Sequence, residues 1–301
     1  MRTYTSLFTR FPDQNKAEVF AHFHWKSHEG ETWQAPFAHL AELAAPEPWG
    51  FGGGDSHKSR DYPILTNYLN HTFLRVQAQD KINYSPDKRR SCFNTGLQTK
   101  EGNDIYATFY WSDMAVALNR TDWVWHGFYP AHSDKLREFE PLPDIATYID
   151  DPSSLVFDDR YEFEIDKRHI LEDNRERLPP ILQDNLTLAL SALDGAVSML
   201  QSRLRRDCML ATPHWYNNQV QLLMPLCITR TDTPDAVLVA ERDDERRKYI
   251  VKTILTPQMA YINARVLRVL HRPWLQGIPM QQVDAPLESA LNPLRRDAAN
   301  G

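Results

Sequence analysis

The chain has 301 residues, of which 42% are apolar and 25% are charged. This is the composition of an ordinary globular protein, and it excludes a disordered chain, a collagen-like repeat and a coiled-coil rod. The 34 basic and 40 acidic residues give a net charge of −6. Nucleic acid is therefore not attracted by the charge of the whole chain, and only local basic patches could bind it.

The cysteines and the apolar stretches indicate the compartment. There are three cysteines, and none lies in a CxxC pair, which disfavours a disulfide framework and a thiolate zinc site. The first ten residues lack the apolar run of a signal peptide, and no stretch reaches the roughly 18 apolar residues of a membrane span. We expect a cytoplasmic protein without a membrane partner; the sequence names no cofactor and no metal site.

The domain organisation is predicted from the glycines and the apolar patterns. Four of the eleven glycines lie at positions 50–54, which predicts a linker or a mobile loop. We expect an N-terminal extension at residues 1–60, one principal domain at 61–283 and a loose C-terminal tail at 284–301. No internal repeat is visible in the sequence.

Apolar periodicity predicts the main elements of that domain. Apolar residues at helical spacing predict helices at 62–79, 181–205 and 257–270. Apolar and aromatic runs predict strands within 92–111, 122–130 and 219–255. We expect an α+β fold, in which these strands form one mostly antiparallel sheet packed by three or four helices.

The first candidate binding segment is Asn94, Thr95 and Gly96, which interrupts an apolar strand. Glycine lets a backbone or a ligand approach closely, and the amide of Asn94 offers both a donor and an acceptor. The alternative is a bulge whose side chains bond to their own backbone.

A second candidate is a histidine beside a carboxylate. If residues 169–177 are helical, His169, Asp173 and Arg177 lie on one face. His169 with Asp173 would then be a catalytic acid–base pair, and Arg177 could bind a phosphate. The alternative is a surface helix with ordinary ion pairs.

A third candidate lies on the last predicted helix. Tyr261, Arg265 and Arg268 share one face of it, with Asn263 to the side. Arginine and tyrosine together suit phosphate binding and base stacking. The alternative is a partly buried helix whose arginines pair with the acidic stretch at 134–166.

Two further segments carry charge or aromatic rings. Lys88, Arg89 and Arg90 form a basic loop before Asn94 that would suit an anionic ligand, although a solvated loop is the simpler interpretation. The stretch 111–129 contains three tryptophans that could dock a partner protein. The acidic residues near Asp158 could gather a divalent metal, but their alternation with apolar residues favours one solvated strand face.

Several of these segments resemble, in their order along the chain, an uncharacterised bacterial family known as domain of unknown function 3825. The resembling residues are Asn67-Tyr68-Leu69, Thr72-Phe73, Phe93–Leu97, Ile105-Tyr106-Ala107, His169-Ile170, Asp173-Asn174, Arg177, Gln221–Leu226, Thr253–Thr256, Met259-Ala260-Tyr261, Asn263-Ala264-Arg265 and Trp274-Leu275. The resemblance covers about Tyr62 to Leu275 and leaves the first 60 residues out. It implies an association with RNA, because such domains occur in other chains joined to RNA-associated modules, including cold-shock-like ones.

Two functional hypotheses follow. In the first, the protein binds a nucleotide or an RNA end and processes it, with the groups of Asn94, Arg177, Tyr261 and Arg265 meeting the ligand. In the second, it is a non-catalytic protein-interaction module that uses the aromatic stretch 111–129. The first predicts that the candidate side chains line one hollow able to hold an anion.

Overall fold

The computed structural model describes residues 2–9, 15–23, 26–27, 30–31, 35–51, 62–113 and 121–267. The chain divides into two compact units, residues 1–268 and 269–301, and everything described belongs to the first. Arg268, the predicted tail at 284–301 and most of the glycine-rich segment therefore lie outside the described residues. None of the described helices is long and apolar enough to cross a bilayer.

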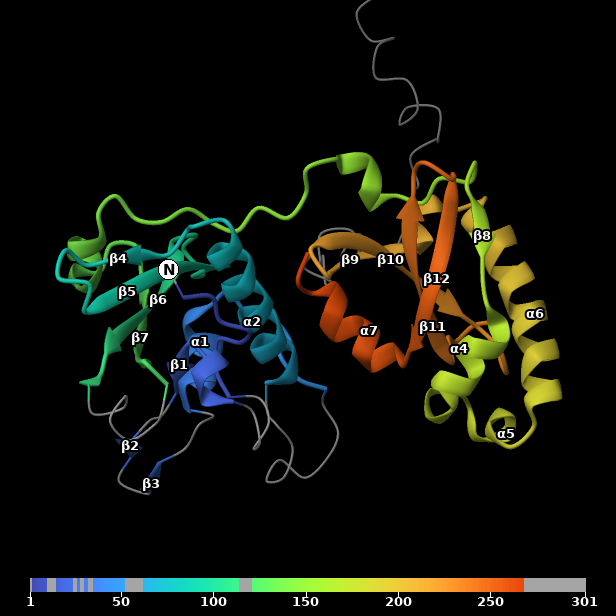
Figure 1. The fold of residues 1–301 in the computed structure, drawn as a ribbon, viewed down its shortest axis with the longest axis horizontal. Helices are drawn as coiled ribbons and strands as arrows, with labels where there is room; N and C mark the ends of the chain where they lie inside the picture. Colours follow the sequence, from blue (N-terminus) through green and yellow to red (C-terminus); the bar gives the residue numbers. More distant parts are fainter. Residues whose placement is uncertain are drawn as a thin grey trace, which may run out of the picture. The chain divides into compact units, whose positions relative to one another are not determined.

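The strands form two five-stranded sheets (Figure 1). The first has the order β1 (Ala21–His22), β7 (Trp123–Pro130), β6 (Asp104–Trp111), β5 (Arg90–Gln98), β4 (Asn83–Tyr84). The second has the order β8 (Glu162–Glu164), β12 (Lys248–Leu255), β11 (Ala236–Asp243), β10 (Gln219–Leu226), β9 (Thr212–Tyr216). A separate short hairpin joins β2 (Lys26–Ser27) to β3 (Gly30–Glu31). The α+β class and the mostly antiparallel pairing are confirmed, but the prediction of a single sheet is wrong, because each set of strands packs around its own core.

Both sheets are built on the same plan. Each begins with a short edge strand that runs parallel to the last strand, β1 beside β7 and β8 beside β12. Helices follow, and then a four-stranded antiparallel meander. In the first half the helices are α1 (Ala35–Leu43) and α2 (Pro63–Ala78); in the second they are α4 (Lys167–Asp173), α5 (Pro180–Gln183) and α6 (Leu186–Leu204). The two halves thus share one topology, although no repeat is visible in the sequence.

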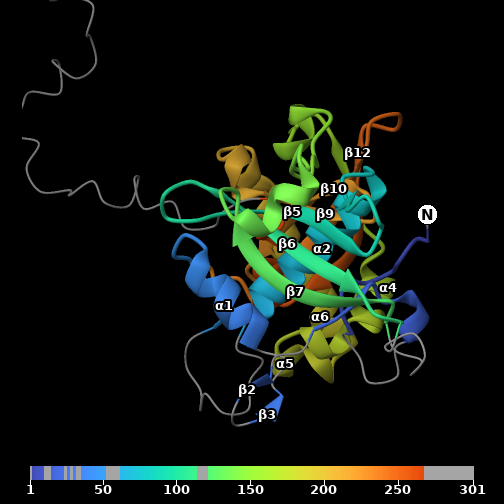
Figure 2. The same ribbon diagram turned by 90° about the vertical axis from the view of Figure 1, so that its left-hand side faces the viewer.

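The first core lies between α2 and its sheet. Pro63 occupies the first turn of α2, where its missing N–H costs nothing, and the predicted apolar face of this helix is buried. That face packs against aromatic side chains of β5 and β6, including Phe93 and Phe109, and α2 lies behind the strands in Figure 2. Segments before residue 50 complete the core with Leu7, Phe20 and Phe37. The predicted domain boundary at residue 60 stays a prediction.

The second core lies between α6 and the second sheet. Leu193 and Leu200 of α6 pack with Leu222, Leu238 and Tyr249 of the sheet. Helix α7 (Pro257–Ala264) lies on the opposite face of this sheet (Figure 1) and contacts β9 to β12. Helices occur where they are predicted at 62–79, 181–205 and 257–270, but the last ends at Ala264, before the predicted end. The second is divided at position 185, where an asparagine side chain caps α6.

A β-bulge occurs at the same place in both sheets. In β7, His126 is an extra residue between the pairs Phe109–Trp125 and Thr108–Gly127. In β12 the extra residue is Lys252, between the pairs Ala240–Val251 and Val239–Thr253. The inward residues of the two strands have the same spacing: Trp123, Trp125 and Phe128 in the first, and Tyr249, Val251 and Ile254 in the second. When the spacing of apolar residues along a strand changes from two to three, the extra residue of a bulge keeps all of them on the same face of the sheet.

Candidate functional site

The bulge aims His126 at the outer face of the first sheet, which we define as the face turned away from α2. Its Nδ1 lies 3.2 Å from the hydroxyl of Thr108, and its ring centroid lies 6.4 Å from that of Tyr110 and 5.7 Å from that of Tyr129. A Cβ at Gly127 would lie 2.6 Å from the ring of Tyr129. The missing side chain at Gly127 therefore lets the Tyr129 ring lie close over the strand.

A hollow of about 80 Å³ opens beside this histidine. It is lined by Arg90, Thr108, Phe109, Tyr110, His126, Lys135, Glu138 and Phe139. The last three belong to the 3₁₀ helix η2 (Asp134–Phe139), which packs on the outer face through Leu136 and Phe139. Since a water molecule occupies about 30 Å³ of the liquid, the hollow has room for a few waters or for one small anion.

The hollow has an excess of positive charge. Arg90 is paired with Glu138 at 3.1 Å, whereas the ammonium of Lys135 has no carboxylate partner within the described part of the chain. Partial burial lowers the pKa of His126, and the charges of Arg90 and Lys135 lower it further. An anion in this hollow would offset those charges and raise the pKa of His126 again. The site can therefore bind an anion beside the exposed ring of Tyr110.

The predicted segment at 94–96 forms a self-bonded bulge, as its alternative interpretation has it. Asn94 accepts from the N–H of Gly96 at 2.9 Å and donates to Asp104 at 3.1 Å. Thr95 donates to the carbonyl of Ile105 at 2.6 Å. Gly96 has a φ of +72°, which glycine adopts without strain. Asn94 and Thr95 are buried and engaged by the fold, so these contacts do not favour ligand binding by either side chain.

The predicted histidine pair lies on the surface of the second half. His169 Nε2 and Asp173 Oδ2 are 3.2 Å apart on α4, and their side chains are 68% and 57% exposed. Helix α4 ends at Asp173, so the prediction of one helical face that includes Arg177 is wrong. Arg177 instead donates to Asn174 at 2.7 Å and to the carbonyl of Ile254 at 2.8 Å.

The residues predicted on the last helix meet a buried ion pair. Arg265 pairs with Glu47, their side chains being 7% and 11% exposed. The alternative that the arginines of this helix pair with the acidic stretch at 134–166 is therefore wrong for Arg265. Its guanidinium lies 4.6 Å from the ring centroid of Tyr68, and a Cβ at Gly96 would lie 2.6 Å from the Tyr68 hydroxyl. Burial raises the pKa of Tyr68.

Tyr261 and Asn263 are half-buried on α7. Burial raises the pKa of Tyr261, and the charges of Glu47 and Arg265 both act on it. The structure thus brings Gly96, Tyr261 and Arg265 to the surroundings of Tyr68. It does not bring His169 or Arg177 there: His169 is exposed on α4, and Arg177 bonds within the second half.

The aromatic stretch and the acidic stretch are largely occupied by the fold. Trp123 and Trp125 are buried in the first core, so neither is available to dock a partner. Asp158 forms an ion pair with Arg160 at 2.6 Å, and this pair lowers the pKa of Asp158 to about 2. No group of three or more potential metal ligands occurs among the residues that the structure describes.

The sequence reasoning did not single out His126, Lys135 or Tyr110. One signal was present. Inward positions at 123, 125 and 128 break the alternation of a strand, and a glycine stands next to the extra residue. That pattern predicts a bulge, and bulges re-aim side chains beside sites. No comparable signal marks Lys135, because its position depends on how η2 packs on the sheet.

Comparison with family models identifies the chain. The model described as Domain of unknown function (DUF3825) matches residues 40–274, which is more than half of the chain. The chain belongs to this family. The match begins before the predicted start near Tyr62 and so takes in Glu47 and Trp49. Searches of curated proteins and of solved structures found no match.

Proposed function

We propose that the protein binds a nucleotide or an RNA end on the outer face of the first sheet. The phosphate occupies the hollow between Arg90 and Lys135, and the base stacks on Tyr110 beside His126. The observation that carries this proposal is the meeting of a guanidinium, an imidazole and an ammonium that no described carboxylate pairs with, in one small hollow next to an aromatic ring that is 38% exposed.

Each part of this ligand matches a group on the face. Phosphate is bound by arginine and lysine in proteins, and the hollow has the volume of one small anion. Aromatic rings stack on bases with little sequence preference, and each such contact contributes about 1–3 kcal/mol. Of the three residues of the predicted basic loop, Lys88, Arg89 and Arg90, only Arg90 lines the hollow; Arg89 is paired with Asp113 at 2.6 Å.

Fluorescence polarisation tests the proposal, with a 5′-phosphorylated oligouridylate of about five nucleotides as the probe. Lys135→Ala should weaken binding several-fold at low salt and reduce the salt dependence by about one phosphate contact. Arg137→Ala is the matched control, because Arg137 lies on the same 3₁₀ helix, is 77% exposed and does not line the hollow. Tyr110→Ala should weaken binding with and without the 5′ phosphate.

Titration of the imidazole provides a second readout. The C2 proton of His126 followed by NMR should report a higher pKa when the oligonucleotide is bound, because the phosphate offsets the charges of Arg90 and Lys135. Absence of binding at low salt, or equal effects of Lys135→Ala and Arg137→Ala, would refute the proposal.

Processing of the bound RNA by His169 and Asp173 stays a prediction. A 3′-labelled RNA incubated with the protein and resolved on a denaturing gel tests it. The expected result under that prediction is a shortened or modified product that disappears in His169→Ala.

A further inference from the structure

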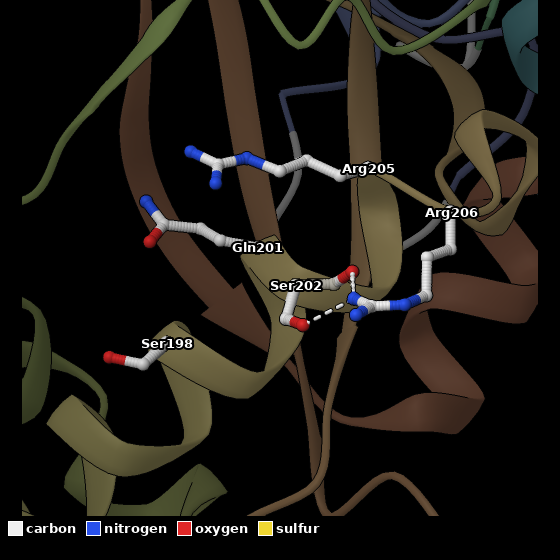
Figure 3. Close-up of a pocket in the computed structure, with 5 residues that line it drawn as sticks. All are labelled: Ser198, Gln201, Ser202, Arg205 and Arg206. Carbon is white, nitrogen blue, oxygen red and sulfur yellow. Dashed lines mark hydrogen bonds between the residues drawn. The ribbon is translucent and has the colours of Figure 1, made fainter.

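A second hollow lies at the C-terminal end of α6, with a volume of about 480 Å³. It is lined by Ser198, Gln201, Ser202, Arg205 and Arg206, which we call the α6 end surface (Figure 3). Gln201 and Ser202 follow Ser198 by three and four residues, and Arg205 follows Ser202 by three, so the first four share one face of the helix. The two serine side chains are short and leave room for the hollow, and the longer glutamine and arginine side chains surround it.

The arginines of this turn are unusual in having no carboxylate partner in the described part of the chain. Twelve of the seventeen arginines that the structure describes form an ion pair with a described carboxylate. Of the five that do not, three lie within one turn, at positions 203, 205 and 206. Their positive charge is therefore not neutralised by the described residues, although the chain as a whole is acidic.

The three guanidinium groups differ in how they are held. Arg203 donates to the carbonyl of Thr231. Arg206 folds back onto Ser202 and donates to its carbonyl at 2.6 Å and to its hydroxyl at 2.5 Å. These bonds cap the end of the helix. Arg205 makes no side-chain hydrogen bond of this kind to the residues that the structure describes. In Figure 3 its side chain extends in the same direction as that of Gln201 and away from Arg206.

Arg205 also lines a neighbouring hollow of about 480 Å³, together with Ser153, Arg160, Cys208 and Arg242 among others. Two acids, Asp158 and Asp159, belong to that lining, and Asp158 is already paired with Arg160. The guanidinium of Arg205 thus stands where two open hollows meet, each with more arginines than carboxylates in its lining.

We propose that the α6 end surface binds phosphate groups of an RNA backbone. This inference rests on the proposed function and extends it to longer RNA. Hydroxyl, amide and guanidinium groups are the usual donors to phosphate oxygens. No apolar or aromatic side chain lines the surface itself, so it offers nothing to stack on a base or to insert into a lipid layer. The α6 end surface therefore recognises the phosphate backbone of the RNA and not its base sequence.

The test compares a short and a long oligouridylate by fluorescence polarisation, with about five and about twenty nucleotides to span several phosphates. The wild type should bind the long RNA more tightly and with a steeper salt dependence than the short one. The double variant Arg205→Ala with Arg206→Ala should lose most of that gain, with a salt slope lower by about two, and should bind the short RNA as the wild type does. Arg205→Ala alone keeps the helix cap of Arg206 and should lower the slope by about one.

Arg168→Ala is the matched control, because Arg168 is a helical arginine, 68% exposed and paired with Glu172. The inference is overturned if the long RNA binds no more tightly than the short one, or if Arg205→Ala and Arg168→Ala behave alike. It is also overturned if Arg205 governs binding to phosphatidylserine vesicles and not to RNA. Failure of both RNAs to bind the wild type refutes the proposed function instead, which separates the two results.

Discussion

The two halves of the chain share a strand order, a parallel edge strand and a bulge, yet they use them differently. The first core is filled by aromatic rings from the sheet, such as Phe93 and Phe109. The second core is filled by leucines of α6. The position equivalent to Phe109 is Ala240, because each pairs with the inward residue that directly precedes the bulge of the last strand. The same topology thus accepts two different divisions of core volume between helix and sheet.

The outer faces show the sharper difference. After β12 the chain forms α7, which covers the outer face of the second sheet with Ala260 and Ala264 buried. After β7 it forms only the short η2, which anchors at one end of the face. The bulge residue is His126 in the hollow of the first sheet, whereas Lys252 of the second pairs with Glu241 at 3.3 Å. The bulge residue of the second sheet is thus engaged by an ion pair, whereas that of the first sheet faces a hollow.

The largest expected effect concerns the two cores. Phe109→Ala should destabilise the protein by about 3–5 kcal/mol, because it removes a fully buried ring and leaves a cavity among rings that cannot close over it. The measurement is the free energy of unfolding in urea. A loss below about 1 kcal/mol would show that the first core repacks easily, and would remove the contrast with a core built on alanine at this position.

A pH effect is expected from a buried histidine on the outer face of the second sheet. His214 is 2% exposed, and burial lowers its pKa to about 4. The pKa of His214 in the folded protein lies below that in the unfolded chain. The contribution of His214 to the free energy of unfolding is therefore complete above about pH 6.5 and falls as the pH drops toward 4, by about 3 kcal/mol in total. His126, exposed on the other sheet, should contribute far less.

Urea unfolding of the wild type and of His214→Gln at neutral pH and near pH 4.5 measures this effect. The difference in stability between the two proteins should shrink as the pH falls, because glutamine does not titrate. Parallel losses in both proteins would mean that other groups account for the acid sensitivity.

The smallest expected effects come from two glycines, one in each half. Gly127→Ala should destabilise by about 1–2 kcal/mol, since its Cβ would meet the Tyr129 ring at 2.6 Å and this ring must move. Gly195→Ala, on the exposed side of α6 with no atom within 4 Å of the new Cβ, should stabilise by about 0.5–1 kcal/mol. Thermal unfolding of both variants measures these effects, and the two changes in melting temperature should have opposite signs.

The sequence predicted the local elements well and their assembly poorly. Apolar spacing located α2, α6 and α7, because each helix buries one continuous face. It could not show that strands before and after residue 130 close around separate cores, since strand patterns carry no partner information. Asn94, Thr95 and Gly96 were recognised as a break in a strand, but whether such a break serves a ligand or a bulge depends on Asp104 and Ile105 across the hairpin.

The candidate site shows the same limit. Arg265 was singled out as a residue for phosphate, but its charge is matched by Glu47, which lies 218 positions away. Lys135 was not singled out, because a lone lysine in an acidic stretch looks like solvated surface. Whether a carboxylate lies within reach of a guanidinium or an ammonium is a property of the folded chain, and the spacing of residues in the sequence does not give it.

The buried pair of Glu47 and Arg265 has a consequence for dissection of the molecule. Its two residues lie near opposite ends of the segment that matches the family model. The ion pair therefore joins the beginning of that segment to its end. Either half expressed alone would carry one of these charges without its counterion. The repeat visible in the topology is for this reason no guide to autonomous fragments, and cutting between the halves should yield two insoluble pieces.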